Sequence, residues 1–355
     1  MAVLIPVLDF HLPAELEATA PPEDRGRGRD DVRLLVARTG SGQIEHRQFP
    51  ELLELLAPGD LLVVNRSATV NAALDGTVDG EAAVLHLSRH LEGRCWIAEL
   101  RHVAPGGTRT TPWLDAPAGT VVDFGERGSA VLCAPAVEVG PGGRSRLWIA
   151  ELRLANGVPA ALATWGHPIT YGESAMRRPL AAYQTVFAAE PGSAEMPSAG
   201  RAFTHELVTE LVAAGIELAP IVLHTGVSSP ETGEPPFAEW FRVPETTARH
   251  VNAVRANGGR AIAVGTTAVR ALETAAAGNA TLPAAEGWTE LVIDEARGVS
   301  IVDGLLTGWH APEATHLDLV RAVAGRDLVD RCYAAATAHG YLWHEFGDLN
   351  LLLPC

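Results

Sequence analysis

Hydrophobic positions along the chain follow two different patterns, and the change between them predicts the domain organisation. Between residues 71 and 155, short alternating or Val-rich runs are broken by Gly and Pro, which is typical of antiparallel β structure. On either side, apolar strand-like runs alternate with helical composition, which indicates an α/β fold. We therefore expect one α/β domain built from residues 1–70 and 156–355, with residues 71–155 inserted as a β-barrel-like domain.

The α/β part predicts individual strands and helices, because Gly, Pro and capping residues mark where each pattern stops. Strands are expected at 32–37, 61–64, 216–224, 261–264, 291–294 and 299–305. Helices are expected near 50–57 and at 204–214, 245–256, 268–277, 315–324 and 327–338.

The hexapeptide WIAELR occurs twice in the β-rich region, at 96–101 and at 148–153. In a half-buried strand it places Trp, Ala and Leu on one side and Ile, Glu and Arg on the other. Two similar strands in one barrel explain the repetition, and six residues are too few to indicate a duplicated domain.

The segment RAIAVGTTAVRALE at 260–273 combines a short buried strand, a Gly-Thr-Thr turn and a helix. Backbone N–H groups at such a helix N-terminus lack intrahelical partners and suit a carboxylate or phosphate. The turn consists of Gly265, Thr266 and Thr267, and either threonine can cap the helix. Arg270, one turn later, can reach back toward the same anion. The alternative is an ordinary capped helix after a buried strand.

The composition is that of a globular protein, and it excludes several classes of catalytic mechanism. Of the 355 residues 47% are hydrophobic, with no apolar stretch near the ~20 residues of a membrane helix. The N-terminus shows no signal-peptide pattern, and the four cysteines are scattered, so we expect a cytoplasmic protein with reduced thiols and no structural zinc. All 27 basic residues are arginine, which excludes Schiff-base, pyridoxal-phosphate and P-loop lysines. The net charge of −16 opposes non-specific nucleic-acid binding but allows a local arginine face.

Polar residues lie at or near the ends of several predicted strands, where open α/β sheets bind ligands. Asn65 ends LLVV, His224 ends IELAPIVL, His310 follows LLTGW, and Asp348 precedes the apolar run at 349–353. Each could instead be a satisfied structural residue. Together with the Gly-Thr-Thr turn they favour one shared cleft. The spacing of His and acidic residues matches no standard metal site, so we expect no metal.

Long segments match one known family in order and spacing. They include PGDLLVVN (58–65), YQTVFAAEPGSAEMPSAGRAFTHELV (183–208), GIELAPIVLHTG (215–226), GGRAIAVGTTAVRALE (258–273) and VDGLLTGWHAPEATHLDLVRAVAG (302–325). With them the chain resembles the S-adenosylmethionine:tRNA ribosyltransferase-isomerase family of queuosine biosynthesis nearly end to end. The fold of that family, an α/β domain carrying an inserted β-barrel, agrees with the pattern described above.

The resemblance implies a reaction in which S-adenosylmethionine is a substrate and donates its ribosyl part. The amine of 7-aminomethyl-7-deazaguanine in the tRNA anticodon attacks the ribose, adenine and methionine leave, and an epoxycyclopentanediol forms. Such chemistry needs a base beside the sulfonium, a group that assists adenine departure, and donors for the methionine carboxylate. By resemblance, His224 and His310 are the acid/base candidates.

The resemblance also implies binding residues. Ser198, Gly200 and Phe203 match a family stretch expected to line the adenosine pocket. The Gly-Thr-Thr turn with Arg270 is expected to hold an anionic part of the substrate. From their strand-end positions, and not from the resemblance, Asn65 and Asp348 are expected to contribute as well.

Several cleft residues depart from the family pattern. The chain has Asn-Arg-Ser-Ala-Thr-Val at 65–70 where the family typically has Asn-Asp/Asn-Thr-Arg-Val, and the segment after His224 is altered and shortened. Three hypotheses therefore stand: the family reaction on a tRNA anticodon stem-loop, a related S-adenosylmethionine-consuming enzyme with a small-molecule acceptor, and a non-catalytic binder. The acceptor, the oligomeric state and the identity of the catalytic base stay open.

Overall fold

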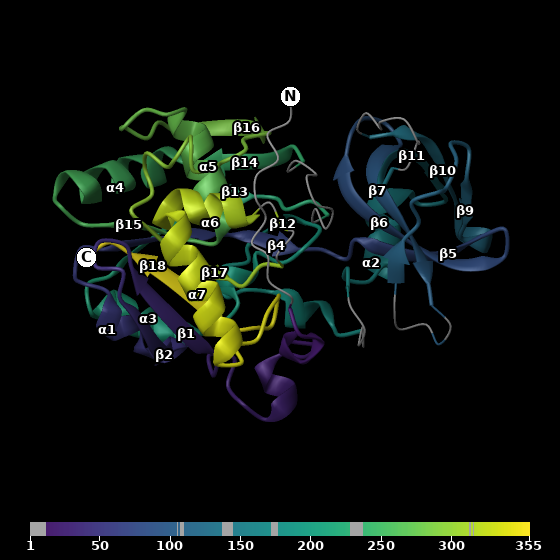
Figure 1. Cartoon of the computed structure of the whole chain (residues 1–355). Helices are drawn as coiled ribbons and strands as arrows, with labels where there is room; N and C mark the ends of the chain where they lie inside the picture. Colours follow the sequence, from purple (N-terminus) through teal and green to yellow (C-terminus); the bar gives the residue numbers. More distant parts are fainter. Residues whose placement is uncertain are drawn as a thin grey trace.

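The computed structural model describes residues 12–104, 106, 110–136, 145–171, 177–227, 237–311, 314 and 316–355. They form two lobes: a larger one with a sheet covered by helices, and a smaller one made of a β-barrel (Figure 1). Strands from the beginning and from the end of the chain meet in the larger sheet. The predicted α/β class with an inserted barrel is confirmed, whereas boundaries at 70/71 and 155/156 remain our proposal.

A nine-stranded sheet forms the centre of the larger lobe. In spatial order its strands are β16 (Ala285–Thr289), β14 (Glu239–Val243), β13 (Glu217–Leu223), β3 (Leu61–Asn65), β15 (Ala261–Val264), β17 (Gly304–Gly308), β18 (Leu349–Leu353), β1 (Arg33–Arg38) and β2 (Ile44–Gln48). β13, β3, β15 and β17 are mutually parallel, while β14 and β18 run the other way. We call the edge at which the four parallel strands end the C-terminal edge; β14, β18 and β1 begin there.

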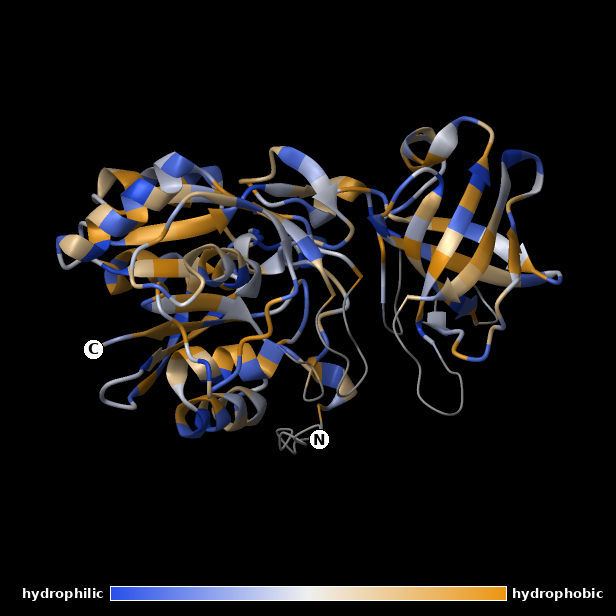
Figure 2. Cartoon of the chain, turned by 90° about the horizontal axis from the view of Figure 1, so that it is seen from above, coloured by the Kyte–Doolittle hydropathy of each residue, from blue (hydrophilic) through white to orange (hydrophobic). Residues whose placement is uncertain are grey.

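The central strands are continuously apolar because both faces of the sheet are covered. Along β3, Leu61 and Val63 belong to one core, and Leu62 and Val64 belong to the other. The first core includes α4 (Glu245–Ala256), α5 (Thr266–Ala276), α6 (His316–Ala324) and α7 (Arg326–Ala338), and the second includes α1 (Leu52–Leu55) and α3 (His205–Ala213). Figure 2 shows these strands mainly in the hydrophobic colour.

The predicted helices are present, with small differences at their ends. The helix predicted at 245–256 has those bounds, and the one near 50–57 is reduced to α1 after a short 3-10 turn. Short 3-10 helices lie at Ala14–Leu16, Pro22–Arg25, Phe49–Glu51, Gly125–Arg127, Leu180–Tyr183 and Ser198–Gly200. Within the described part of the chain, no helix has both the length and the apolar character needed to cross a membrane.

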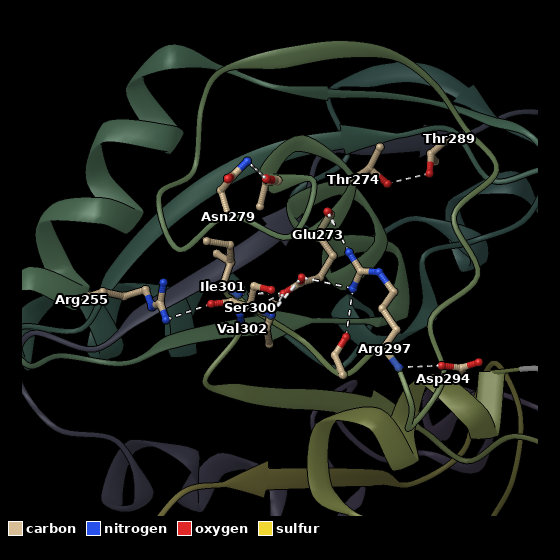
Figure 3. Close-up of polar contacts among 12 residues, drawn as sticks. Arg255, Glu273, Thr274, Asn279, Thr289, Asp294, Arg297, Ser300, Ile301 and Val302 are labelled. Carbon is tan, nitrogen blue, oxygen red and sulfur yellow. Dashed lines mark hydrogen bonds and ion pairs between the residues drawn. The ribbon is translucent and has the colours of Figure 1, made fainter.

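Two predicted strands differ from the structure, and one buried carboxylate explains the second difference. Residues 291–294 form no strand, and the strand predicted at 299–305 begins only at Gly304. The carboxylate of Glu273 on α5, fully buried, binds the loop at 300–302 just before Gly304 (Figure 3). It accepts hydrogen bonds from the backbone N–H groups of Ser300 (2.8 Å), Ile301 (2.8 Å) and Val302 (3.3 Å). Donors used in this way are not available to a strand ladder.

The smaller lobe is a closed barrel. Its strands are β5 (Ala73–Val78), β6 (Glu81–His90), β7 (Cys95–Val103), β9 (Val121–Asp123), β10 (Gly128–Pro135) and β11 (Leu147–Leu154), with β8 (Thr110–Pro112) added beside β7. Pairing of β11 with β7 closes it, and the two WIAELR segments thereby pair with each other, Ile97 opposite Ile149. Their Trp, Ala and Leu side chains lie in the barrel core and both Ile side chains in a separate cluster, which confirms the predicted alternation. Helix α2 (Gly157–Thr164) follows β11.

A small parallel sheet lies beyond the end of β3. It consists of β4 (Ser67–Thr69) and β12 (Glu190–Ser193), with Thr69 opposite Ser193. The pairing brings segments that are far apart in the sequence next to each other.

The two lobes share an apolar cluster. It contains Val84 and Ile97 of the barrel together with Val227, which follows β13 in the larger lobe. Nearby, the guanidinium carbon of Arg89 on β6 lies 4.7 Å from the ring centroid of Trp288 on β16. The orientation of the barrel against the sheet is therefore supported by apolar and cation–π contacts.

Candidate functional site

The strand register places most of the predicted site residues along the C-terminal edge. Asn65 ends β3, and His224, Gly265 and His310 follow β13, β15 and β17. Asp348 precedes β18, which is antiparallel to β17, and so lies at the same edge. In open α/β sheets this edge is the usual place for a ligand.

Gly265 makes the turn between β15 and α5. Its φ of 91° and ψ of 154° lie in a region that is essentially restricted to glycine. A Cβ added to Gly265 would also lie 3.3 Å from the Cβ of Ala199. Gly265 itself is the N-cap, and no side chain caps the helix, so the expectation that Thr266 or Thr267 does so is wrong. The glycine N-cap leaves the first-turn N–H groups without a side-chain acceptor.

The turn also presents an unused hydroxyl. Thr267 Oγ1 is buried and has no hydrogen-bond partner among the described residues. An unpaired buried hydroxyl costs free energy that a bound polar group can recover. The 3-10 helix Ser198–Gly200 lies beside the turn through Ala199. The adenosine-pocket role expected of Ser198 and Gly200 stays a prediction.

Arg270 has partners other than the anion expected from the sequence. It is 7% exposed, its guanidinium forms an ion pair with Glu239, and it donates to the carbonyl oxygens of Phe237 and Thr289, each at 3.3 Å. Glu239 Oε1 also accepts a hydrogen bond from the backbone N–H of Gly226 at 2.9 Å. The pair therefore joins α5 to the segment after β13. Burial raises the pKa of Glu239, although the charge of Arg270 opposes this shift.

His224 contacts one hydroxyl group, which is itself bonded to a second. Its Nδ1 lies 2.7 Å from Ser67 Oγ, which in turn lies 2.6 Å from Ser193 Oγ. The imidazole stacks on Trp240 with centroids 5.4 Å apart, and a Cβ at Gly192 would lie 2.5 Å from ring atoms. The ring is therefore fixed on several sides.

Burial lowers the pKa of His224. The positive charge of Arg242 acts in the same direction, and the negative charge of Glu190 opposes it. The imidazole is consequently neutral at neutral pH, and can donate or accept a hydrogen bond according to its tautomer.

Asn65 connects two strands. Its Nδ2 donates to the carbonyl oxygen of Leu223 at 2.8 Å, and its Oδ1 accepts from the N–H of Leu223 at 3.1 Å and of Ser67 at 3.0 Å. The side chain of Asn65 is thus bonded within the fold, whereas the sequence led us to expect that it binds substrate. These hydrogen bonds fix the end of β3 against β13 and so position Ser67 beside His224.

His310 belongs to a second histidine group. Its Nε2 lies 3.0 Å from Thr307 Oγ1, and its ring stacks on His316 with centroids 4.8 Å apart. Burial lowers the pKa of His310 well below its ordinary value, and it lowers the pKa of His316 to about 4, where the charge of Arg270 contributes. His316 thus lies within electrostatic range of Arg270. No set of three His, Cys, Asp or Glu in the described ranges is arranged to hold a metal ion.

Two predicted binding residues have structural partners. Asp348 accepts hydrogen bonds from the backbone N–H of Arg33 (2.7 Å), from Arg33 Nη2 (2.8 Å) and from the N–H of Leu342 (2.8 Å). Phe203 is fully buried and packs edge-to-face on Phe49 with centroids 5.1 Å apart. In these contacts both residues stabilise the fold, because the carboxylate neutralises an arginine and the ring fills the second core.

The sequence interpretation missed several residues that shape this edge. They are Ser67, Ser193, Glu239, Trp240 and His316. Glu239 had a recognisable signal, since it is a lone carboxylate within the aromatic stretch FAEWF. The two serines had none, because only the pairing of β4 with β12 brings them together.

Known proteins match the chain over nearly its whole length. A family model described as queuosine biosynthesis protein matches residues 6–352. The S-adenosylmethionine:tRNA ribosyltransferase-isomerase of Desulfitobacterium hafniense is 35% identical over 352 residues, which cover 97% of this chain and 98% of that protein. The protein of the same name from Symbiobacterium thermophilum is 38% identical over 359 residues, with coverage of 97% and 98%.

A solved structure is similar over the same length. The crystal structure of S-adenosylmethionine tRNA ribosyltransferase from Thermotoga maritima superposes with a TM-score of 0.54 at 31% identity, covering 98% of this chain and 99% of that one. Because the family model and the relatives each span nearly the whole chain, the protein belongs to the queuosine biosynthesis protein family.

Proposed function

We propose that this protein is an S-adenosylmethionine-dependent ribosyltransferase-isomerase that acts on tRNA. The observation that carries the proposal is the match, over 97% of the chain, to relatives named for this activity. In the reaction, the amine of 7-aminomethyl-7-deazaguanine in the anticodon attacks the ribose, adenine and methionine leave, and an epoxycyclopentanediol forms.

The turn after β15 supports binding of an anionic part of the substrate. The N-terminus of α5 carries the positive end of the helix dipole, and its first N–H groups lack a side-chain cap. Thr267 Oγ1 adds an unused hydrogen-bonding group at the same place. The methionine carboxylate of S-adenosylmethionine has the charge and the geometry that such a site binds.

The two histidines support the chemical step. The positive sulfur makes the neighbouring C–H acidic, so a neutral imidazole is a suitable proton acceptor, and an N–H group can assist adenine departure. Burial keeps both His224 and His310 neutral by lowering their pKa values. They flank the turn along the edge, because β13 and β17 lie on either side of β3 and β15.

The test uses S-adenosylmethionine with four acceptor conditions: none, free 7-aminomethyl-7-deazaguanine, an unmodified anticodon stem-loop, and a stem-loop carrying that base. We expect adenine and methionine to be released in equal amounts, and only with the modified stem-loop. Release of adenine and methionine with the free base alone would show that the acceptor is a small molecule and not tRNA. Absence of release in all four conditions would contradict an enzymatic role.

A further inference from the structure

A chain of hydroxyl groups runs from the backbone to the imidazole of His224. The N–H of Thr225 donates to Ser193 Oγ at 3.1 Å, Ser193 Oγ lies 2.6 Å from Ser67 Oγ, and Ser67 Oγ lies 2.7 Å from His224 Nδ1. Ser67 is 1% exposed and Ser193 is fully buried, so neither hydroxyl group is open to bulk solvent.

Counting hydrogens fixes the direction of this chain. The oxygen of Ser193 already accepts from the backbone of Thr225, and its own hydrogen has Ser67 Oγ as acceptor among the residues that the structure describes. The hydrogen of Ser67 is then directed to His224 Nδ1. The reverse direction would leave the buried hydrogen of Ser193 without an acceptor, and unpaired buried donors are costly.

We propose that Ser67 and Ser193 are positioning residues that hold His224 in the neutral tautomer with its hydrogen on Nε2. Within the described ranges, no residue forms a hydrogen bond with Nε2. His224 therefore presents an N–H donor to the substrate and not a free base. This inference rests on the proposed function for the identity of the substrate. It gives His224 the role of assisting the departure of adenine, because an N–H donor stabilises the negative charge that develops on the leaving base.

The charges around His224 are compatible with this assignment. Arg242 on β14 forms an ion pair with Glu190 on β12 at 2.5 Å, and Arg66 lies 4.0 Å from the same carboxylate. The carboxylate is thus shared by two arginines, so it does not impose a proton on the imidazole. The direction of the hydrogen bonds from Ser193 through Ser67, and not an acidic neighbour, sets the tautomer of His224.

The tautomer can be measured without any enzymatic assay. Long-range ¹H–¹⁵N correlation of histidine-labelled protein reports which ring nitrogen carries the hydrogen, and the His224→Gln variant identifies the signal. We expect Nδ1 to be unprotonated and Nε2 protonated. In Ser67→Ala the pKa of His224 should rise, because a hydrogen bond to the neutral form is lost. A hydrogen on Nδ1, or a lower pKa in Ser67→Ala, would overturn the proposal.

Kinetics with the modified stem-loop test the consequence for catalysis. Glutamine can place an N–H near the position of Nε2 but cannot accept a proton as a base. We expect His224→Gln to retain activity within about tenfold and His224→Ala to lose at least about a hundredfold in kcat. If both variants lose the same activity, His224 is not acting as a donor and the proposal fails.

Serine variants complete the test. Ser67→Ala should lower kcat by about tenfold with little change in KM, and Ser67→Thr should restore it. Thr247→Val is the matched control, because it removes a buried hydroxyl that donates to Pro220 O at 2.6 Å, away from the C-terminal edge. Wild-type activity in Ser67→Ala would overturn the positioning role. If the wild-type protein releases no adenine, the proposed function fails, and the NMR measurement still decides the tautomer.

Discussion

At the scale of single residues, the C-terminal edge contains charges that are neutralised within the fold. Arg270 and Glu239 are both largely buried, with side chains 9% and 15% exposed. The position of Arg270 in a helix was evident from the sequence. Glu239 lies in strand β14, and nothing in the sequence around either residue links the two. Sequence patterns indicate which residues lie at strand ends, but they do not indicate with which groups the polar atoms of these residues form hydrogen bonds or ion pairs.

Arg270→Gln should destabilise the protein, because it leaves the carboxylate of Glu239 buried without its counter-charge. We expect a loss of about 3–5 kcal/mol in the free energy of unfolding. The double variant Arg270→Gln/Glu239→Gln should recover a large part of that loss, since it removes the unpaired charge. Urea denaturation measures both values. A double variant no more stable than Arg270→Gln would show that the pair is not the source of the effect.

The buried side chain of His316 should make the stability of the protein depend on pH. Burial lowers the pKa of His316 from 6.5 to about 4 in the folded protein. Between these values the unfolded chain binds more protons, so the free energy of unfolding should decrease as the pH falls through this window. His316→Gln should make this decrease shallower. Denaturation curves collected from neutral to mildly acidic pH provide the comparison, and an identical slope in the variant would contradict the assignment.

At the scale of elements, the strands buried on both faces were predictable and the loops between them were not. The runs at 61–64 and 261–264 are continuously apolar, and they form β3 and β15, which pair directly. The segment at 299–303 also contains three apolar residues, yet the carboxylate of Glu273 binds its backbone N–H groups, and the strand begins only at Gly304. A carboxylate within a helix gives no sequence signal that it binds backbone N–H groups more than twenty residues away.

Glu273→Gln tests the importance of this contact for α5 and its neighbouring loop. The amide replaces an acceptor oxygen by an NH₂ group that faces backbone donors, so we expect a loss of about 3 kcal/mol in the free energy of unfolding. Thermal or urea denaturation measures it. Glu286→Gln, at an exposed position of β16, is the control and should change stability by less than about 0.5 kcal/mol. Equal stability of the two variants would exclude a structural role for Glu273.

At the scale of the whole molecule, an apolar cluster and nearby polar contacts hold the barrel against the sheet. Val227 is 3% exposed in the shared cluster, and its backbone N–H donates to Ser88 Oγ of β6 at 3.0 Å. Its side chain does not belong to the separate barrel core. Interface contacts can therefore be weakened while each lobe keeps its own core.

Val227→Asp should separate the lobes without unfolding them, because it places a charge in an apolar cluster. We expect a larger radius of gyration by small-angle X-ray scattering and an unchanged far-ultraviolet circular dichroism spectrum. Val227→Ile, which keeps the site apolar, is the matched control. Loss of the dichroism signal in Val227→Asp would show that the cluster is needed for folding of the lobes themselves.

The position of β18 has a consequence for synthesis on the ribosome. β18 lies between β17 and β1, so the edge of β1 opposite β2 has no neighbouring strand until residues 349–353 have been made. At roughly 5–20 residues per second, this interval is on the order of tens of seconds. The barrel strands, all contained within residues 73–154, can pair long before then. Until β18 is made, β1 is therefore paired only with β2 and its other edge stays open after the barrel is complete. Open apolar strand edges promote aggregation, so this stage of synthesis is the one most exposed to it.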